Sequence, residues 1–269
     1  MHGSTMKNRI EWPTFVLIVT TYAIFALGLW GATYSMGLAV LLLTIAGVLH
    51  SSLSHEALHG HPTSSVFVNA VLVTPALTLF VPYLRFRDTH IAHHHDENLT
   101  DPYDDPETNF IDPEVWERWP LWRKAVQQWN NTLLGRMIVG PIIGQIVFMY
   151  SDAKAILNGN RRIALSWGIH TISVCAIFWF ISHVSNVTFL AYALASYFSL
   201  SILKIRTFLE HRAHDHAAAR TVIIEDRGLL ALFFLNNNFH SVHHAHPKLA
   251  WYDLPKIYQS NKDQYLARN

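Results

Sequence analysis

Two long uncharged stretches dominate the hydrophobic pattern of the chain. No Asp, Glu, Lys or Arg occurs between Glu11 and Glu56, a run of 44 residues, or between Arg162 and Lys204, a run of 41. Each run can hold two helices of about 20 residues, the length that crosses a bilayer, and a short turn. The pattern predicts two membrane-spanning helical hairpins, with helices at about 13–34, 38–58, 164–183 and 188–208.

The positive charges indicate how these hairpins are oriented. None of the 20 Lys and Arg residues lies in either hairpin or in the turns GATYSMG (31–37) and HVSNVT (183–188). Loops rich in Lys and Arg stay on the cytoplasmic side of a membrane. We therefore expect both turns outside, and both termini and the rest of the chain in the cytoplasm.

Two further apolar stretches are harder to place. Residues 66–84 are interrupted by Pro75 and Pro82, and residues 137–150 are short and have basic residues on both sides. We expect both to form interfacial or re-entrant helices. The predicted fold is an all-α polytopic membrane protein, 1–269, with four transmembrane helices and a cytoplasmic histidine-rich cap at about 85–162 and 209–269.

Composition narrows the possible functions. A net charge of +1 lacks the basic excess of nucleic-acid-binding proteins, so no nucleic-acid partner is expected. A single cysteine, Cys175, excludes an intramolecular disulfide and cysteine-rich metal sites. The 18 histidines are the unusual feature, because imidazole is the commonest metal ligand in proteins.

The histidines recur with helical spacing. His55 and His59 in HEALH are four residues apart, and the pattern H-x-x-H-H occurs twice. Spacings of three and four gather side chains on one helix face. We interpret these eight residues as metal ligands, and His211, just beyond the fourth span, is a plausible ninth. The two repeated patterns comprise His90, His93, His94, His240, His243 and His244.

Eight or nine imidazoles exceed the ligands of one ion, so two metals are the economical count. A dinuclear site that faces a bilayer and lacks thiolates suggests iron, used with O2 against an aliphatic C–H bond of a lipid. Carboxylates could orient the imidazoles by accepting a proton from the second ring nitrogen, and candidates for this role are Asp101, Asp105 and Glu107. Asn237, just ahead of HSVHH, could hold a metal-bound water through its amide or form a turn.

Other functions fit parts of the pattern. HEALH also matches the H-E-x-x-H signature of zinc proteases, with Glu56 as general base, but such a site leaves both H-x-x-H-H patterns without a role. A metal transporter or sensor would need polar ligands deep in the spans, where the only candidates are His50, His170 and His183 and neither uncharged stretch has an acidic residue. The roles of His50 and His214 stay open.

HEALH, HIAHH and HSVHH, together with His211, resemble the three histidine boxes and extra ligand of the integral-membrane fatty acid desaturase superfamily. This superfamily also contains hydroxylases, alkane monooxygenases and carotenoid ketolases. The resemblance runs from about His50 to Tyr258 and includes the segment NNNFHSVHHAHPKLAWYDLP, which is similar to the third-box region of bacterial members. The first box has three intervening residues where many acyl desaturases have four, a spacing also found in hydroxylases and ketolases.

The resemblance implies two iron ions (Fe2+/Fe3+), O2 as co-substrate, and a separate electron donor of ferredoxin, rubredoxin or cytochrome type. It implies fatty acyl desaturation, with hydroxylation or ketolation of a lipid, alkane or carotenoid as the alternative, in a membrane such as a bacterial inner membrane. No catalytic residue is expected beyond the metal ligands. The resemblance carries ligand roles onto His55, His59, His90, His93, His94, His211, His240, His243 and His244.

Overall fold

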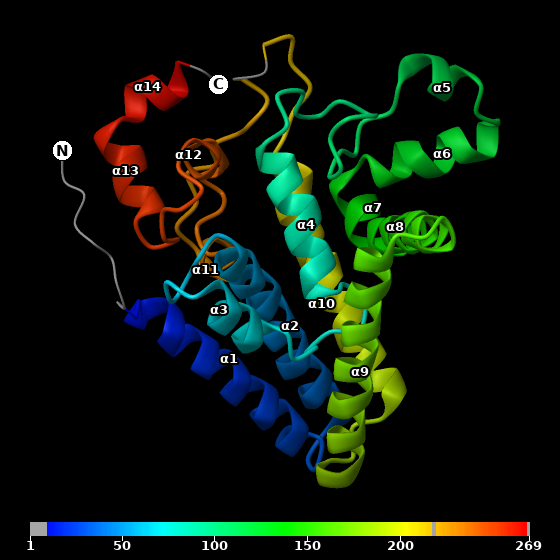
Figure 1. Cartoon of the computed structure of the whole chain (residues 1–269), viewed down its shortest axis with the longest axis vertical. Coiled ribbons are helices and arrows are strands. Elements are labelled where there is room, and N and C mark those ends of the chain that lie inside the picture. The colour runs from blue at the N-terminus through cyan, green and yellow to red at the C-terminus, as the bar shows by residue number, and fades with distance from the viewer. Residues whose placement is uncertain (1–9, 217–218, 268–269) are drawn as a thin grey trace. The chain divides into compact units, whose positions relative to one another are not determined.

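The computed structural model describes residues 10–216 and 219–267, and the regular elements of this part of the chain are helices (Figure 1). Extended pairing within these residues is limited to two isolated bridges, which join His211 to Thr221 and Ile223 to Phe239. The prediction of an all-α protein is confirmed.

Four helices are long and apolar enough to cross a membrane, as the uncharged stretches predict. They follow each other in two pairs, each joined by a short turn, so the expected hairpins are present. The four helices are α1 (Trp12–Gly31), α2 (Met36–Leu58), α9 (Arg161–Val184) and α10 (Phe189–Leu209).

The chain divides into two compact units, and each is described by itself. The first comprises residues 1–85 and 164–199, and the second comprises residues 86–163 and 200–269. α4 (Tyr83–His94) and α10 both begin in the first unit and end in the second.

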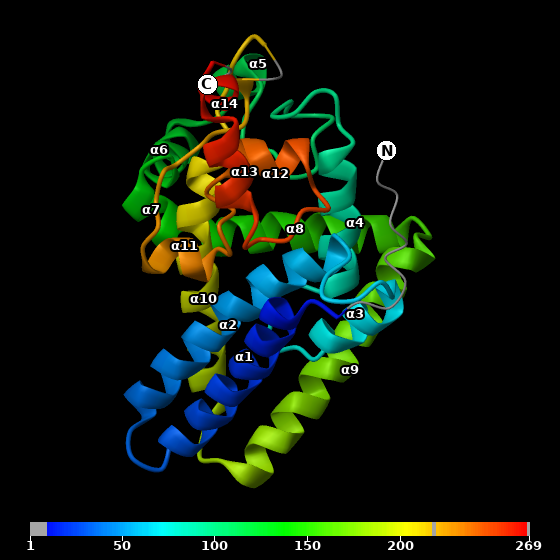
Figure 2. The ribbon, with the colours of Figure 1, turned by 90° about the vertical axis from the view of Figure 1, so that its left-hand side faces the viewer.

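The first unit is built from α1, α2, the short α3 (Val66–Val73), most of α9 and the first half of α10. α1 and α2 lie side by side (Figures 1 and 2). These helices carry apolar residues all round, which is typical of helices surrounded by lipid and protein. The side chains that they bury against one another include Phe25, Leu29, Leu43, Ala46, Leu77, Ile181, Tyr192 and Ala195.

Gly47 allows α2 and α10 to approach closely. A Cβ atom built on Gly47 would collide with Oγ of Ser199 and would lie 2.8 Å from Cγ2 of Thr78. In turn, Ser199 Oγ donates a hydrogen bond to the backbone oxygen of Thr44 at 3.0 Å. Small residues at helix contacts of this kind are a common means of packing in membranes.

A non-helical segment, 74–82, lies among the helices of the first unit. α3 ends at Val73 because Pro75, two residues further on, has no backbone N–H with which to continue the helical hydrogen bonds. Backbone groups of the segment are bonded by side chains from α9 and α10. Ser173 Oγ, for example, donates to the Thr74 oxygen at 3.2 Å and accepts from the Ala76 N–H at 2.8 Å. The other side chains that bond this backbone are His170, Tyr192 and Ser196.

This arrangement explains how residues 66–84 can avoid crossing as one helix. Unbonded backbone is costly within a bilayer, so non-helical chain occurs there only where protein supplies the partners. The interfacial or re-entrant placement of residues 66–84 stays a prediction.

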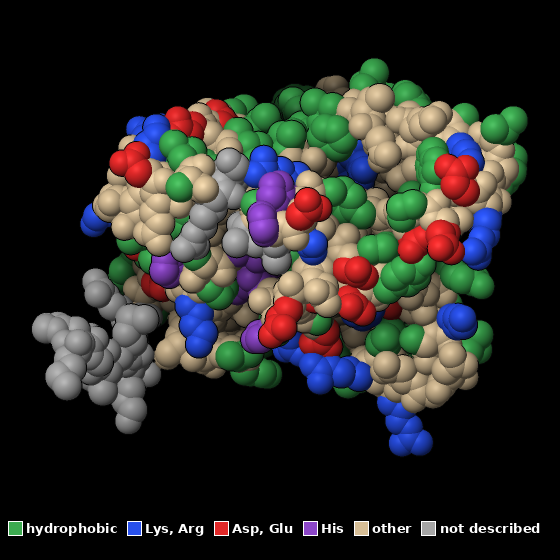
Figure 3. Space-filling view, turned by 90° about the horizontal axis from the view of Figure 1, so that it is seen from above, with side chains coloured by type: hydrophobic (Ala, Val, Ile, Leu, Met, Phe, Trp, Pro, Cys, Tyr) green, Lys and Arg blue, Asp and Glu red, His purple; other side chains and the backbone are tan. Residues whose placement is uncertain are grey.

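The second unit contains the rest of α4, the second half of α10 and a set of shorter helices. These are α5 (Pro113–Glu117), α6 (Leu121–Asn130), α7 (Leu133–Ile138), α8 (Gly140–Leu157), α11 (Leu229–Phe233), α12 (His240–Ala245), α13 (Leu254–Ser260) and α14 (Lys262–Leu266). The view in Figure 3 shows acidic, basic and histidine side chains on one face of the molecule, interspersed with hydrophobic ones.

The helices α6 and α8 expose large apolar side chains. Trp122 on α6 and Ile146, Val147 and Tyr150 on α8 are each more than half exposed. α6 places Trp122, Val126 and Trp129 on one side and Arg123 and Lys124 on the other, the amphipathic pattern of helices at a membrane surface. The interfacial role expected for residues 137–150 stays a prediction.

Candidate metal centre

The two H-x-x-H-H patterns lie on α4 and α12 of the second unit, and their imidazoles converge. One group consists of His93, His211, His240 and His244, whose nitrogens offered as ligands lie within 4.8 Å of one another. His90, His94 and His243 form a second group that meets the same limit. His90, His93, His240 and His243 are buried, and the other three histidines are half-buried.

Each pattern contributes to both groups, which refines the expectation that its three histidines share one face. Residues four apart differ by about 40° around a helix, whereas adjacent residues differ by about 100°. On α4, His90 and His94 therefore point into one group while His93 points into the other. α12 does the converse, with His240 and His244 paired and His243 separate.

Nitrogen atoms face nitrogen atoms within each group. In the group of four, the Nε2 atom of His211 lies 3.1 Å from that of His93 and 3.0 Å from that of His240. In the group of three, the Nε2 atom of His94 lies 3.1 Å from that of His90 and 2.9 Å from that of His243.

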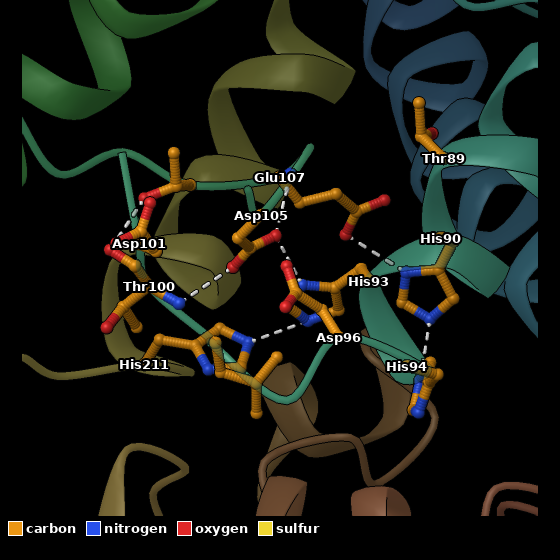
Figure 4. A network of polar contacts seen from close by, with 12 residues as sticks. Thr89, His90, His93, His94, Asp96, Thr100, Asp101, Asp105, Glu107 and His211 are labelled. Carbon is orange, nitrogen blue, oxygen red and sulfur yellow. Dashed lines mark hydrogen bonds and ion pairs between the residues drawn. The ribbon is translucent and has the colours of Figure 1, made fainter. Parts of the chain in front are cut away.

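A carboxylate holds the opposite nitrogen of His93. The Nδ1–H of His93 donates to Oδ1 of Asp105 at 2.7 Å (Figure 4). Asp105 is itself fixed, because its Oδ1 accepts from the Glu107 N–H at 2.9 Å and its Oδ2 from the Thr100 N–H at 2.9 Å. Thr100 has a φ of 72°, a conformation that β-branched residues seldom adopt. The loop thus accepts backbone strain in aiming Asp105 at His93.

Comparable contacts hold two other imidazoles. His90 Nδ1–H donates to Oε2 of Glu107 at 3.0 Å (Figure 4). His240 Nδ1–H donates to Oδ1 of Asn237 at 3.2 Å, and the Asn237 amide nitrogen donates to Oε1 of Glu210 at 2.8 Å. Glu210 also forms an ion pair with Arg206 at 2.9 Å.

These contacts indicate which ring nitrogen of each histidine carries the proton, and they leave the other ring nitrogen suited to binding a metal cation. Since the Nδ1 atoms of His90, His93 and His240 donate to acceptors, their Nε2 atoms carry lone pairs when the rings are neutral. Each of these lone pairs points at the Nε2 atom of another histidine about 3 Å away, and a cation bound between them could be ligated by both nitrogens. The histidine cluster is therefore able to bind metal.

Burial favours the neutral, metal-binding form of two of these histidines. Burial, reinforced by the nearby His93, lowers the pKa of His211 to about 4. Burial and the surrounding imidazoles lower the pKa of His240 well below its usual value.

His93 behaves differently because of its carboxylate. Burial disfavours its cation, but the Asp105 hydrogen bond and nearby carboxylates outweigh that effect and raise the pKa of His93. The pKa of Asp105 is correspondingly lowered, since the bonds from His93, Thr100 and Glu107 overcome the cost of its burial. Each member of the pair thus stabilises the charged form of the other.

The remaining predicted site residues lie as follows. His55 and His59 are on α2 in the first unit, with ring centroids 4.9 Å apart. Asp101 contacts backbone in its own loop, where its Oδ1 accepts from the N–H groups of Tyr103 and Asp104. His50 is buried on α2 beside Tyr22, and His214 is exposed.

Sequence reasoning missed the Arg206–Glu210 ion pair and its link through Asn237 to His240. The spacing of four residues between Arg206 and Glu210 could have indicated the pair. Its connection to Asn237, 27 residues further along, has no local signal.

Four helices able to cross a membrane and a histidine cluster able to bind metal define a helical membrane protein with a candidate metal centre. More specifically, the chain belongs to the fatty acid desaturase family, whose family model matches residues 31–269. It is therefore a membrane-associated oxidoreductase of lipid chains. None of the curated proteins matches the chain.

Proposed function

We propose that this protein is an O2-dependent di-iron oxidoreductase that desaturates fatty acyl chains. The observation that supports the proposal best is the division of the imidazoles into two groups, each with nitrogen lone pairs directed inward. Two groups of ligands suit two metal ions, and membership of the fatty acid desaturase family indicates a lipid substrate.

The proposed ligand set contains nine histidines. His93, His211, His240 and His244 would bind one iron, and His90, His94 and His243 would contribute to the second. We add His55 and His59 from their spacing in HEALH and from the family resemblance. Asp105, Glu107 and Asn237 would keep the protons on Nδ1 and hold the rings in place, which is how such partners raise metal affinity.

The choice of iron rests on chemistry. Imidazole nitrogen suits iron, zinc, copper and nickel alike, and removal of hydrogen from an aliphatic chain with O2 needs a redox-active metal. The Nε2 atoms of His93 and His240, 3.1 and 3.0 Å from that of His211, are close enough for all three to bind one ion.

A zinc protease centred on HEALH would use the site differently. Its glutamate must reach a water molecule and a peptide, yet Glu56 is 3% exposed within the first unit. The histidines of α4 and α12 would also have no role in such an enzyme.

When bound, the irons would supply the activation of O2 that removes hydrogen from an unactivated C–H bond. The protein contributes neutral imidazoles with no thiolate, a buried setting for the ions and fixed ring orientations. Electrons would come from a separate donor of ferredoxin, rubredoxin or cytochrome type.

The distribution of Lys and Arg supports a cytoplasmic location for both termini and for the metal site, in a membrane such as a bacterial inner membrane. Cysteine accessibility provides a direct check. A cysteine placed in the turn 32–35 of a Cys175→Ala protein should react with an impermeant maleimide from outside intact cells.

Two measurements on the same cells test the function. Metal analysis of the purified protein should find iron, and lipid mass spectrometry with and without the gene should show acyl chains that have lost two hydrogen atoms. A gain of one oxygen atom would instead assign hydroxylation, or ketolation after further oxidation. Bound zinc with no O2-dependent change in lipids would refute the proposal.

A further inference from the structure

A hollow of about 460 Å³ opens on the second unit between α11 and α13. Arg227, Gly228 and Leu232 form its wall on the side of α11, and Lys256 and Gln259 form it on the side of α13. Sites that enclose small ligands measure about 300–1,000 Å³, so the hollow has room for a headgroup or a small molecule. No histidine is among the described residues that line it, so it is separate from the candidate metal centre.

The charged side chains that line the hollow are both positive. Arg227 and Lys256 are exposed on different walls, and the described residues of the lining include no Asp or Glu. Within residues 10–216 and 219–267, neither cation forms a hydrogen bond or an ion pair through its side chain. Two positive charges that share a hollow repel each other, and an anion held between them would attract both.

The acidic residues next to Arg227 in the sequence are engaged elsewhere. Both carboxylate oxygens of Asp226 accept from backbone N–H groups at the start of α11. Glu225 is paired with Lys262 at 2.6 Å, and it interacts with Arg227 only through space. The positive charge of Arg227 and Lys256 therefore stays available to an anion from outside the chain.

The hollow has a fixed shape. The amide nitrogen of Asn236 donates to the backbone oxygen of Trp251 at 3.1 Å, and both residues line the space. This bond ties the end of the α11 segment to the chain that leads into α13. A site that is already in shape costs less to order when its ligand binds.

Exposed leucines adjoin the cations on α11. Leu232 lines the hollow and is 44% exposed, and Leu229, three residues earlier and on the same side of the helix, is 64% exposed. A small soluble anion would leave these side chains in water. An anionic lipid would bring its phosphate to the cations and its chains to the leucines, which is how charge and apolar contact combine at anionic membrane surfaces.

We propose that the hollow binds the phosphate group of an anionic membrane phospholipid, with Arg227 and Lys256 on either side of the phosphate and an acyl chain against Leu229 and Leu232. The planar guanidinium can donate to two phosphate oxygens, and the ammonium acts as a point charge. The lipid would be a stationary ligand of the folded protein. The inference depends neither on iron nor on the proposed reaction.

Native mass spectrometry tests the proposal without turnover. The full-length, metal-loaded protein in neutral detergent is titrated with phosphatidylglycerol, and the affinity for the first lipid bound is measured. Arg227→Gln/Lys256→Gln should weaken this affinity about 30-fold, because each cation near an anionic lipid contributes about fivefold. Both side chains are exposed, so the unfolding temperature in lipid-free detergent should not change.

A second double variant provides the matched control. Lys154→Gln/Arg161→Gln also removes one Lys and one Arg charge, from exposed residues of the second unit that do not line the hollow. Its affinity for phosphatidylglycerol should equal that of the unsubstituted protein. Equal losses in the two double variants, or no loss in Arg227→Gln/Lys256→Gln, would overturn the inference.

Two further probes separate the lipid from its anionic group. Phosphatidylcholine has no net charge and should bind equally to all three proteins, whereas a loss in Arg227→Gln/Lys256→Gln alone would show that the hollow does not select an anionic lipid. Glycerol phosphate carries the anion without the chains and should not displace phosphatidylglycerol at an equal concentration. Displacement would identify the ligand as a soluble phosphate and refute the lipid assignment.

Discussion

The Nδ1 atom of His93 lies 2.7 Å from Oδ1 of Asp105, and both side chains are buried. This contact fixes which nitrogen of His93 is available to a metal. Asp105 accepts from His93 and also from the backbone of Thr100 and Glu107, so neither of its oxygens can be replaced by an N–H group without loss.

Asp105→Asn should therefore weaken metal binding. Its amide N–H would oppose one of these donors, and loss of such a partner typically lowers metal affinity about 10- to 100-fold. Iron retained after dialysis against graded chelator concentrations measures the effect. Asp101→Asn, in the same loop but bonded to loop backbone, is the control and should retain iron as the unsubstituted protein does.

Removal of a single imidazole should affect metal content and not membrane insertion. His93→Ala would leave its group with three histidines, and His243→Ala would weaken the other group. Both variants are expected to lose iron and lipid oxidation while still fractionating with membranes. Metal analysis of the purified variants provides the measurement.

His95→Ala is the comparison for these variants. His95 is exposed and contacts the backbone oxygen of Ile91, although it adjoins His94 in the sequence. The His95→Ala variant should keep its iron and its activity. Full turnover in His93→Ala or His243→Ala would contradict the ligand assignment.

The contact of α2 with α10 at Gly47 should be sensitive to a single methyl group. Gly47→Ala would force Ser199 and Thr78 to move, and overpacking of this kind costs about 1–3 kcal/mol. A lower unfolding temperature in detergent would report it. Gly168→Ala, on α9 with nothing near its added Cβ, should be neutral; equal destabilisation of both variants would argue against the close contact.

Acid should destabilise the metal-free protein between about pH 6.5 and pH 4. Burial first, and then the nearby His93, lowers the pKa of His211 to about 4, and the pKa of His240 is also lowered. Below about pH 6.5 these two histidines would become protonated in the unfolded chain, whereas in the folded protein they would stay neutral. Their contribution to stability is present above pH 6.5 and is lost as the pH falls to about 4.

His93 acts in the opposite sense, because its raised pKa adds stability that is complete below pH 6.5 and lost as the pH rises. Because the pKa is lowered for His211 and His240 and raised only for His93, we expect a net loss of folding stability on acidification. Unfolding temperatures of the stripped protein across this range measure it. His211→Gln should make the decline shallower, and an unchanged slope would count against the assignment.

The spans could be predicted from sequence because their signal is local. Charged residues such as Glu11, Arg162 and Lys204 delimit the uncharged stretches, and the helices fall within a few residues of the expected limits. The structure of residues 74–82 could not be predicted in the same way. Pro75 signals a break, but the side chains that bond this backbone come from Ser173 and others about 100 residues away.

The histidine cluster could be predicted in part from the sequence. Helical spacing identified the residues, and the angle of about 100° between adjacent residues could have shown that His93 and His94 point into different groups. The partners of Nδ1 could not be separated by sequence. Asp101 and Asp105 occur in one acidic loop, and only the turn at Thr100 determines that Asp105 meets His93.

The segment 74–82 also has a consequence for biogenesis. Its backbone relies on His170, Ser173, Tyr192 and Ser196, which the ribosome adds long after the first hairpin has been made. Until those residues arrive, the nascent chain holds polar amides next to lipid with no native partner. We therefore expect a chain truncated before residue 170 to leave this backbone without its native partners and to be degraded by cellular quality control.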